Sequence, residues 1–546
     1  MKKYIFLTLF LILPFFLFSQ GVQQINQNTY QNPILPGFHP DPSIVRVGDD
    51  FYMVTSSFEF WPAIPIYHSK DLVNWKLINH VVNRKEQINM SGIQPSDGFY
   101  APTIRYNNGT FYLAVSYVIR KSLLVTNYIF KTTDIRGDWS QPYTITQGDG
   151  WKIDPDLFFD DNGKTYFSAN ALHTDYPDIR WRREIRMQEI DIENMKLTGK
   201  VHTICRGAMI DAVAVEAPHV FKKDGKYFLV IAEGGTGIGH SVTIFKSDSI
   251  FGPYKNYGNN PILTHRHLAY TTYIQNVGHA DLVERQNGEW WLVALGVRNI
   301  TGIGFPLGRE TFLVPMIWEK DKFPVINPTL GGVPDIAKRP NLNLQPFEKE
   351  NDTIFFKTNT LPLYFNTIRN TRTPYKIDKA KLELALVPET LSDSITPAFI
   401  GRRLQHHSFE VVTKVYFKPE SSHEEAGLSM MYDSKRFYNM MITSHNNSPV
   451  VVLKMGESET PLAVLQLDKN KISKGLFLKI SSKQHIYNFS FSYDGTTYQD
   501  LAVDISGKHL HATVFTGTYT GFYASSNGKP SKNTATFEFF TYRPLE

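Results

Sequence analysis

The sequence is poor in cysteine, in net charge and in long apolar segments. Cys205 is the only cysteine among 546 residues, so no disulfide can form within the chain, and we expect this lone thiol to serve packing. The 57 Lys and Arg nearly balance the 52 Asp and Glu, and a net charge of +5 argues against nucleic acid as the main partner. Beyond the N-terminus no stretch approaches the ~20 apolar residues that a membrane-spanning helix needs. With 42% hydrophobic residues, the chain can instead bury a large core.

The N-terminus has the pattern of a secretory signal peptide. Lys2 and Lys3 precede an apolar run over residues 4–18, and Ser19-Gln20-Gly21 follows. A short basic region, about 15 apolar residues and small or polar residues after them are typical of such a signal. We therefore expect residues 1–20 to be removed and the mature protein to be exported, to the periplasm or the outside of the cell.

Five segments repeat the same order of a tight turn followed by an aromatic-rich strand. They are residues 49–52, 108–112, 162–166, 224–228 and 287–291. Four of the turns are Asn-Gly or Asp-Gly, a strong hairpin signal, and their glycines are 54, 62 and 63 residues apart. Repeats of about 60 residues made of short strands are typical of propeller blades, with four strands in each blade. The sequence predicts a five-bladed β-propeller over residues 28–340.

The pattern changes after the last repeat. Residues 323–347 are rich in proline and glycine, which indicates a connection between domains. Beyond them, apolar and polar residues alternate in segments 409–417, 487–493 and 535–541, as in strands with one buried face. We therefore expect an all-β protein in which residues 341–546 form a C-terminal β-sandwich, with catalysis confined to the propeller.

Each repeat begins with a polar or aromatic residue at one equivalent position. Counting back nine residues from the second turn residue gives Asp41, Tyr100, Asp154, Glu216 and His279. The first strand of each blade lines the propeller axis, so these five residues should meet in a central funnel. The sequence thus predicts a pocket that holds three carboxylates.

Three carboxylates in a partly dry pocket favour hydrolysis of a glycosidic bond. Burial and like charge raise the pKa of at least one carboxyl group, so one stays protonated while another is ionised. Hydrolysis uses such a pair, an acid for the leaving oxygen and a carboxylate for water or the anomeric carbon, and a third carboxylate can tune the acid. Asp41 and Asp154 each precede a proline and are also typical of turns. Glu216 follows an apolar run, where burying an unpaired carboxylate is costly.

Three further residues are candidates for substrate binding. Arg309 follows a glycine-rich loop and could hold a sugar hydroxyl, keep a carboxylate ionised or simply be exposed. Trp61 could stack on a sugar ring or pack in the core. His279 could be a general base, a metal ligand at the axis or a structural histidine.

Four motifs in this order resemble glycoside hydrolase family 43, in its β-xylosidase and α-L-arabinofuranosidase branch. They are NPILPGFHPDPS at 32–43, IDPD at 153–156, VEAPH at 215–219 and GRET at 308–311. The resemblance covers nearly the whole mature chain and implies an inverting mechanism on a five-bladed propeller. It implies that Asp41 is the general base, Glu216 the general acid and Asp154 a modulator of that acid. It also matches Arg309 to the family's pocket arginine, and His279 to an axial histidine that helps to hold calcium in some members.

Two departures from the family pattern lie near the expected pocket. Tyr100-Ala101-Pro102 stands where many relatives have Trp-Ala-Pro, and the aromatic order of Phe60-Trp61 is swapped against some β-xylosidases. Both bear on which sugar is preferred. The resemblance further implies a concanavalin-like C-terminal sandwich that packs on the propeller, closes one side of the pocket with a loop and so favours exo action.

Together these features predict an exported, exo-acting, inverting glycoside hydrolase. It would release terminal β-D-xylose, α-L-arabinofuranose or both from xylan or arabinan oligosaccharides of plant cell walls. The alternative is a non-catalytic carbohydrate-binding propeller that uses the same funnel. The chemistry requires no cofactor, and a structural calcium near the axis stays open. The expected partner is an oligosaccharide substrate, with no nucleic acid and no membrane span.

Overall fold

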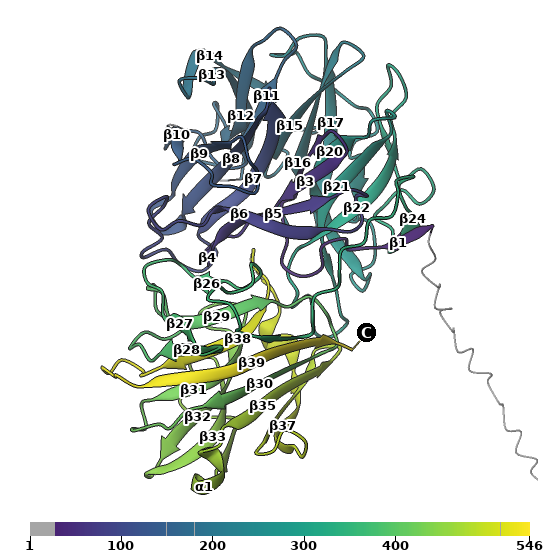
Figure 1. Ribbon diagram of the computed structural model, residues 1–546. Coiled ribbons are helices and arrows are strands. Elements are labelled where there is room, and N and C mark those ends of the chain that lie inside the picture. Colours follow the sequence, from purple (N-terminus) through teal and green to yellow (C-terminus); the bar gives the residue numbers. More distant parts are fainter. Residues whose placement is uncertain (1–27, 149, 180, 514, 546) are drawn as a thin grey trace, which may run out of the picture.

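The computed structural model describes residues 28–148, 150–179, 181–513 and 515–545 as two β-rich bodies joined side to side (Figure 1). The expected signal peptide, residues 1–20, lies outside the described residues. Purple to teal strands form the first body, and green to yellow strands form the second. Helical structure is confined to α1 (Lys469–Ile472) and two short 3-10 turns in the part that the structure describes. In the same part, no helix is long and apolar enough to cross a membrane.

The first body is a five-bladed propeller, as the repeats predict. Each blade is an antiparallel sheet whose four strands follow one another along the chain. The first blade contains β2 (Ser43–Val47), β3 (Asp50–Val54), β5 (Ala63–Ser69) and β6 (Lys76–Val82), and the second contains β7 (Gly98–Asn107), β8 (Thr110–Ile119), β9 (Leu124–Thr132) and β10 (Tyr143–Gln147). The third contains β11 (Asp156–Phe159), β12 (Thr165–Leu172), β13 (Arg183–Asp191) and β14 (Lys196–Cys205), and the fourth contains β15 (Glu216–Lys223), β16 (Lys226–Glu233), β17 (Ser241–Ser247) and β18 (Lys255–Asn256). The fifth contains β20 (Ile274–Glu284), β21 (Trp290–Arg298), β22 (Glu310–Ile317) and β23 (Val325–Ile326). A short strand, β19 (Leu263–Thr264), also pairs with β17. The first strands β2, β7, β11, β15 and β20 contact one another in a ring, so they surround the axis.

Turn chemistry explains the hairpins between the first and second strands. Gly109, Gly163, Gly225 and Gly288 have φ of +82°, +82°, +71° and +80°, the left-handed region that favours glycine. A Cβ atom at Gly109, Gly163 or Gly225 would meet no neighbour within 4 Å, and one at Gly288 would meet only the Oε1 atom of Glu284, at 4.0 Å. These turns therefore need glycine for its backbone conformation and not for space.

The two ends of the propeller chain meet at the fifth blade. The first strand, β1 (Thr29–Gln31), pairs with β24 (Ile336–Lys338). Asn32 exchanges two hydrogen bonds with the backbone of Leu313 in β22, through Nδ2 at 2.8 Å and Oδ1 at 2.9 Å. The side chain of one buried asparagine thereby holds the N-terminal strand on the last blade.

The second body is a sandwich of two antiparallel sheets, the predicted concanavalin-like fold. One sheet contains β25 (Thr353–Phe355), β27 (Tyr375–Asp378), β28 (Lys381–Ala385), β30 (Phe409–Tyr416), β35 (Leu476–Lys483), β36 (Ile486–Ser492), β37 (Gln499–Ser506) and β39 (Thr534–Pro544). The other contains β29 (Ala398–Arg403), β31 (Glu425–Met431), β32 (Phe437–His445), β33 (Ser448–Met455), β34 (Ala463–Gln466) and β38 (Tyr519–Ser525). Apolar side chains from both sheets form one buried cluster between them.

The two bodies are joined by backbone pairing as well as by packing. Strand β4 (Phe60–Trp61) of the propeller pairs with β26 (Thr367–Ile368), which leads into the sandwich (Figure 1). Phe60 stacks on Tyr519 of β38 with ring centroids 3.9 Å apart. A Cβ at Gly308 would lie 2.7 Å from Gly517, so two glycines allow the loop before β38 to approach the fifth blade closely. This contact brings residues of the sandwich next to Arg309.

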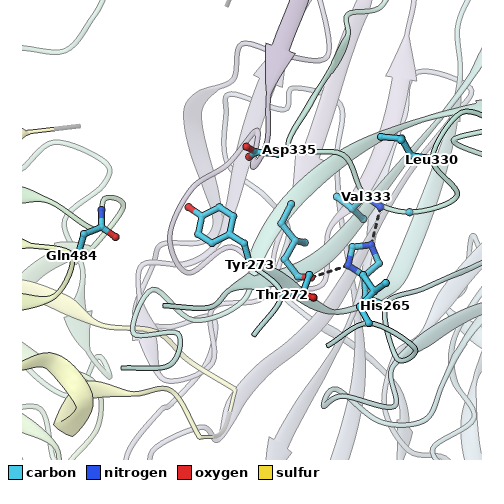
Figure 2. Close-up of a pocket in the computed structure, with 10 residues that line it drawn as sticks. His265, Thr272, Tyr273, Leu330, Val333, Asp335 and Gln484 are labelled. Atoms are coloured by element: carbon cyan, nitrogen blue, oxygen red, sulfur yellow. Dashed lines mark hydrogen bonds between the residues drawn. The ribbon is translucent and has the colours of Figure 1, made fainter. Parts of the chain in front are cut away.

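A surface cavity of about 690 Å³ lies at the same junction (Figure 2). His265, Tyr273, Leu330 and Asp335 of the propeller and Gln484 of the sandwich are among the residues that line it. The predicted carboxylates do not line this cavity. The candidate active site is at the propeller axis instead.

Candidate active site

The five residues at the repeated position lie within the inner strands or up to two residues before them. In each blade a left-handed residue other than glycine stands at this position or directly after it. These residues, with φ between 40° and 63°, are Asp41, Ala101, Asp154, Ala217 and His279. Such φ values are uncommon for residues with a side chain and cluster at functional sites. The left-handed residue is the carboxylate or histidine itself in three blades, and it directly follows Tyr100 and Glu216 in the other two.

Asp41 is buried, with 5% of its surface exposed, and both of its carboxylate oxygens are occupied. Arg309 donates from Nη1 to Oδ1 over 2.7 Å, and Ser56 donates from Oγ to Oδ2 over 2.6 Å. Nδ1 of His279 lies 3.6 Å from Oδ1. Burial raises the pKa of Asp41, but the charge of Arg309 and the hydrogen bond from Ser56 outweigh this effect, so its pKa lies below the ordinary value. Asp41 is therefore ionised at neutral pH.

Arg309 is held by both bodies of the protein. Its Nε and Nη2 donate to the carbonyl oxygen of Phe515, in the sandwich loop before β38, over 3.2 Å each. The guanidinium carbon lies 5.6 Å from the ring centroid of Phe58 and 5.5 Å from that of Phe515. Nη1 also donates to Oγ1 of Thr236 over 3.3 Å. The cation that pairs with Asp41 is thus fixed in place by a contact between domains.

Asp154 and Glu216 form the second part of the site. The backbone N–H of Asp154 donates to Oγ of Ser116 over 3.1 Å. Oδ2 of Asp154 accepts the backbone N–H of Ala217 over 3.1 Å. Ala217 follows Glu216 directly, so this hydrogen bond connects the third blade to the start of the fourth. It places the Asp154 carboxyl at the start of β15, where Glu216 lies.

The electrostatic environment separates the three carboxylates into two kinds. Burial and the charge of Asp41 raise the pKa of Glu216 to about 7. Burial, Glu216 and Asp41 raise the pKa of Asp154 well above its ordinary value. Asp154 and Glu216 therefore retain at least one proton between them near neutral pH, while Asp41 is ionised. One end of the site can donate a proton and the other end can accept one.

A second layer of polar residues crosses the axis below the carboxylates. Each inner strand contributes one residue, two to five positions after the repeated one: Ser43, Arg105, Asp156, His219 and Asp281. Arg105 donates to Oδ2 of Asp281 over 3.0 Å and lies 2.9 Å from Oδ1 of Asp156. Its Nη2 also lies 3.0 Å from Nδ1 of His219, and Ser43 donates to Asp281 over 2.7 Å. One guanidinium therefore pairs with both axial carboxylates, Asp156 and Asp281.

The residues near His279 do not fit a protein-built calcium cage. Calcium takes six to eight oxygen ligands, mainly carboxylates and carbonyls. Asp281, the carboxylate nearest along the strand, is bound by Arg105, and Asp41 is bound by Arg309. No group of three or more His, Cys, Asp or Glu side chains suited to a metal occurs among the described residues. Burial lowers the pKa of His279 to about 3, so a neutral imidazole lies beside Asp41.

The aromatic residues of the site differ in part from those that the sequence suggested. Trp61 is 9% exposed and belongs to the hydrophobic core between the first two blades, which is the second of its two predicted roles. Phe58, three residues earlier, stacks on Phe515 with ring centroids 5.8 Å apart. Tyr100 lies edge-on to Phe515 at 5.6 Å, and its hydroxyl donates to the carbonyl of Ser96. An aromatic wall around Arg309 is therefore made by Phe58, Tyr100 and Phe515.

Several site residues have no signal in the repeat pattern. Ser56 and Thr236 are small hydroxyl residues in loops and Ser116 lies in β8, and nothing in the local sequence separates them from other small polar residues. Phe515 reaches the site only because the sandwich packs on the propeller, 206 residues from Arg309 along the chain. The closely packed Gly517 is the one sequence feature near Phe515 that marks this approach.

Comparison with known proteins agrees with this architecture. The family model described as glycosyl hydrolases family 43 matches residues 30–324, and the beta xylosidase C-terminal concanavalin A-like domain matches residues 353–543. A xylosidase/arabinosidase from Butyrivibrio fibrisolvens is 36% identical over 93% of this chain and 98% of its own length. A non-reducing end alpha-L-arabinofuranosidase from Bacteroides ovatus is 34% identical over 95% of this chain and 96% of its own.

Solved structures agree with the sequence comparison. The crystal structure of a xylan beta-1,4-xylosidase from Bacillus halodurans superimposes with a TM-score of 0.87 at 32% identity, covering 94% of this chain and all of that one. Fold, domain order and relatives over the full length lead to the same assignment. The chain belongs to glycosyl hydrolase family 43 and is a glycoside hydrolase.

Proposed function

We propose that this protein is an exported, inverting exo-glycosidase that removes terminal β-D-xylose or α-L-arabinofuranose from oligosaccharides of plant cell walls. The observation that carries the proposal is the contrast between Asp41, ionised and bound by Arg309, and Glu216, whose pKa is about 7. Such a contrast is what acid and base roles on two sides of one bond require. Export is supported by the leader pattern of residues 1–20.

In the proposed mechanism Glu216 is the general acid and Asp41 the general base. Glu216, protonated near neutral pH, donates its proton to the glycosidic oxygen as the bond to the anomeric carbon breaks. Asp41 removes a proton from a water molecule that attacks the anomeric carbon from the opposite face. In total, one water molecule is consumed, one free pentose is released and one hydroxyl group forms on the leaving saccharide. The anomeric configuration inverts because there is a single displacement.

Asp154 acts on the acid and not on the substrate bond in this proposal. Its carboxyl accepts the N–H of Ala217, the residue after Glu216, and so positions the acid, while burial and the charge of Asp41 favour the protonated form of Glu216. Arg309 keeps Asp41 ionised and oriented. His279, held neutral by burial, lies 3.6 Å from Asp41 and supports its orientation.

Exo action is supported by the domain contact. The Phe515 loop of the sandwich covers one side of the axial site through Arg309, Phe58 and Tyr100. A wall on that side favours a pocket for one terminal sugar over an open groove. Xylose and arabinofuranose are both pentoses of similar outline, so activity on both is consistent with a small pocket. The two relatives that carry a xylosidase/arabinosidase or arabinofuranosidase name point to the same pair of sugars.

The experiment that tests the proposal is hydrolysis of an aryl β-D-xylopyranoside and an aryl α-L-arabinofuranoside, followed by proton NMR of the sugar first released. We expect turnover of at least one substrate, with α-xylose appearing before β-xylose from the xyloside. First release of β-xylose from the xyloside, or of α-arabinose from the arabinofuranoside, would contradict inversion. Absence of turnover on both substrates would contradict the assignment to these sugars.

A further inference from the structure

An exposed apolar surface lies on the rim of the candidate active site, beside Glu216. We define it as the ledge, formed by the β12–β13 connection (residues 173–179 and 181–182) and the β14–β15 connection (residues 206–215). Six of its large apolar side chains are between 44% and 95% exposed. They are Tyr176, Ile179, Trp181, Met209, Ile210 and Val213. Large exposed apolar groups gathered in one place are typical of a binding surface.

The topology places the ledge at the active-site face of the propeller. Strands β11 and β12 are antiparallel, with Asp156 opposite Ser168, so the chain leaves β12 at the edge where Asp154 lies. Strands β13 and β14 are antiparallel in the same way, and the connection after β14 runs directly into Glu216. Both connections therefore lie at the end of the blades that carries the carboxylates.

The ledge is tied to the segment before Glu216. The backbone N–H of Ala214 donates to the carbonyl oxygen of Trp181 over 3.0 Å. On its other side, Val213 accepts the N–H of Gly234 over 2.7 Å. Gly234 begins the loop that carries Thr236, which in turn contacts Arg309. The ledge thus ends directly before the proposed acid and is continuous with the walls of the site.

Ionic and aromatic contacts hold the two connections of the ledge together. Arg182 pairs with Asp211 across them, and its guanidinium carbon lies 4.2 Å from the ring centroid of Tyr176. Arg206 lies 3.5 Å from Asp175 in a second ion pair between the same connections. These contacts use the polar groups of the ledge and leave Trp181 and Ile210 exposed at 59% and 95%. The apolar side chains are therefore presented on a supported surface.

We infer that the ledge is the binding surface for the leaving saccharide, with Trp181 as the ring on which a sugar stacks. This inference rests on the proposed function and extends it from the terminal sugar to the part of the substrate that departs. The acid protonates the oxygen between the terminal sugar and the leaving saccharide, so the leaving saccharide must lie on the side of Glu216. An indole face binds the apolar face of a sugar ring. The enzyme accordingly prefers oligosaccharides whose leaving part is long enough to cover Trp181 and Ile210.

The test compares kcat/KM on xylo- and arabino-oligosaccharides of two to five sugars for the wild type, Trp181→Ala and Ile210→Ser. We expect kcat/KM of the wild type to rise with chain length. Trp181→Ala should remove most of that rise, a loss of about tenfold on the longest substrate if one stacking contact is removed. Inhibition by the free pentose should stay unchanged, because a single sugar occupies only the pocket of the terminal residue.

Two variants control for unfolding and for general surface effects. Ile210 is almost fully exposed, so Ile210→Ser should not disturb the core. This variant should reduce the rise of kcat/KM with chain length by a smaller factor than Trp181→Ala. Tyr270→Ala removes an aromatic ring that is 80% exposed on the connection between β19 and β20, outside the ledge, and should leave the dependence on chain length unchanged.

The outcomes separate this inference from the proposed function. If the wild type hydrolyses pentosides but Trp181→Ala lowers kcat/KM equally at every chain length, or not at all, the ledge inference is wrong and the proposed function stands. Loss of a concentration-dependent dimer in Trp181→Ala with unchanged kinetics would also overturn it, since the ledge would then bind a second copy of the chain. A wild type without pentosidase activity would overturn the proposed function itself.

Discussion

Ser56 offers a direct test of how the site keeps Asp41 ionised. Its hydroxyl donates to Oδ2 of Asp41 over 2.6 Å and accepts the backbone N–H of Ala101 over 2.6 Å. Ser56→Ala removes a donor that stabilises the charged form, so the pKa of Asp41 rises. A hydrogen bond to a charged group is worth about 1.5–3 kcal/mol, and 1.36 kcal/mol corresponds to one pH unit, so the rise should be roughly one to two pH units.

The pH dependence of kcat/KM measures this change. The proposed base must be ionised, so activity falls as pH decreases through the pKa of Asp41, and Ser56→Ala moves this acidic limb toward neutral pH. The N–H of Ala101 also loses its partner, which should lower the free energy of unfolding by about 1–3 kcal/mol in a denaturant titration. Ser57→Ala is the matched control, because the Oγ of this buried neighbour accepts the N–H of Ile64 and no contact with Asp41 is involved. A uniform loss of activity with an unmoved acidic limb would refute the electrostatic argument.

Three further predictions concern the acid, the domain contact and metal dependence. The kcat/KM of the wild type should fall above about pH 7, because Glu216 with a pKa of about 7 must be protonated; a basic limb that persists in Glu216→Gln on an aryl glycoside would contradict this. Phe515→Ala removes a ring 5.5 Å from the Arg309 guanidinium and should raise KM for aryl pentosides about two- to tenfold in steady-state kinetics; an unchanged KM would show that the sandwich does not shape the pocket. A chelator should leave the melting temperature and activity unchanged, because Arg105 already binds the axial carboxylates; a loss of either that calcium restores would contradict this.

The carboxylates could be predicted from the sequence because their positions follow from local geometry. Each lies nine residues before the second turn residue, and strand and turn lengths are encoded within one blade. The structure adds a backbone feature of the shared position, a left-handed residue at it or directly after it in each blade, such as Asp41 with φ of 54° and Asp154 with φ of 63°. The propeller and sandwich were predictable for the same reason, since periodicity is a local property.

The rest of the site depends on packing between distant segments. Phe58 and Trp61 belong to one short aromatic segment, and only the pairing of β4 with β26 and the surrounding core determine that Phe58 faces Arg309. Phe515 enters through the contact of Gly517 with the fifth blade, which no periodicity encodes. Arg105 gave no signal either, because its partners Asp156 and Asp281 come from two other blades.

The most direct test of the central claim is the dependence of the Glu216→Gln variant on its leaving group. A sugar alkoxide must be protonated to depart, whereas a nitrophenolate is stable enough to leave unaided. The account predicts that Glu216→Gln loses about 10²–10⁴ in kcat/KM on a disaccharide and much less on the nitrophenyl glycoside of the same terminal pentose. Equal losses on both substrates, or full activity on the disaccharide, would contradict the assignment of Glu216 as the acid.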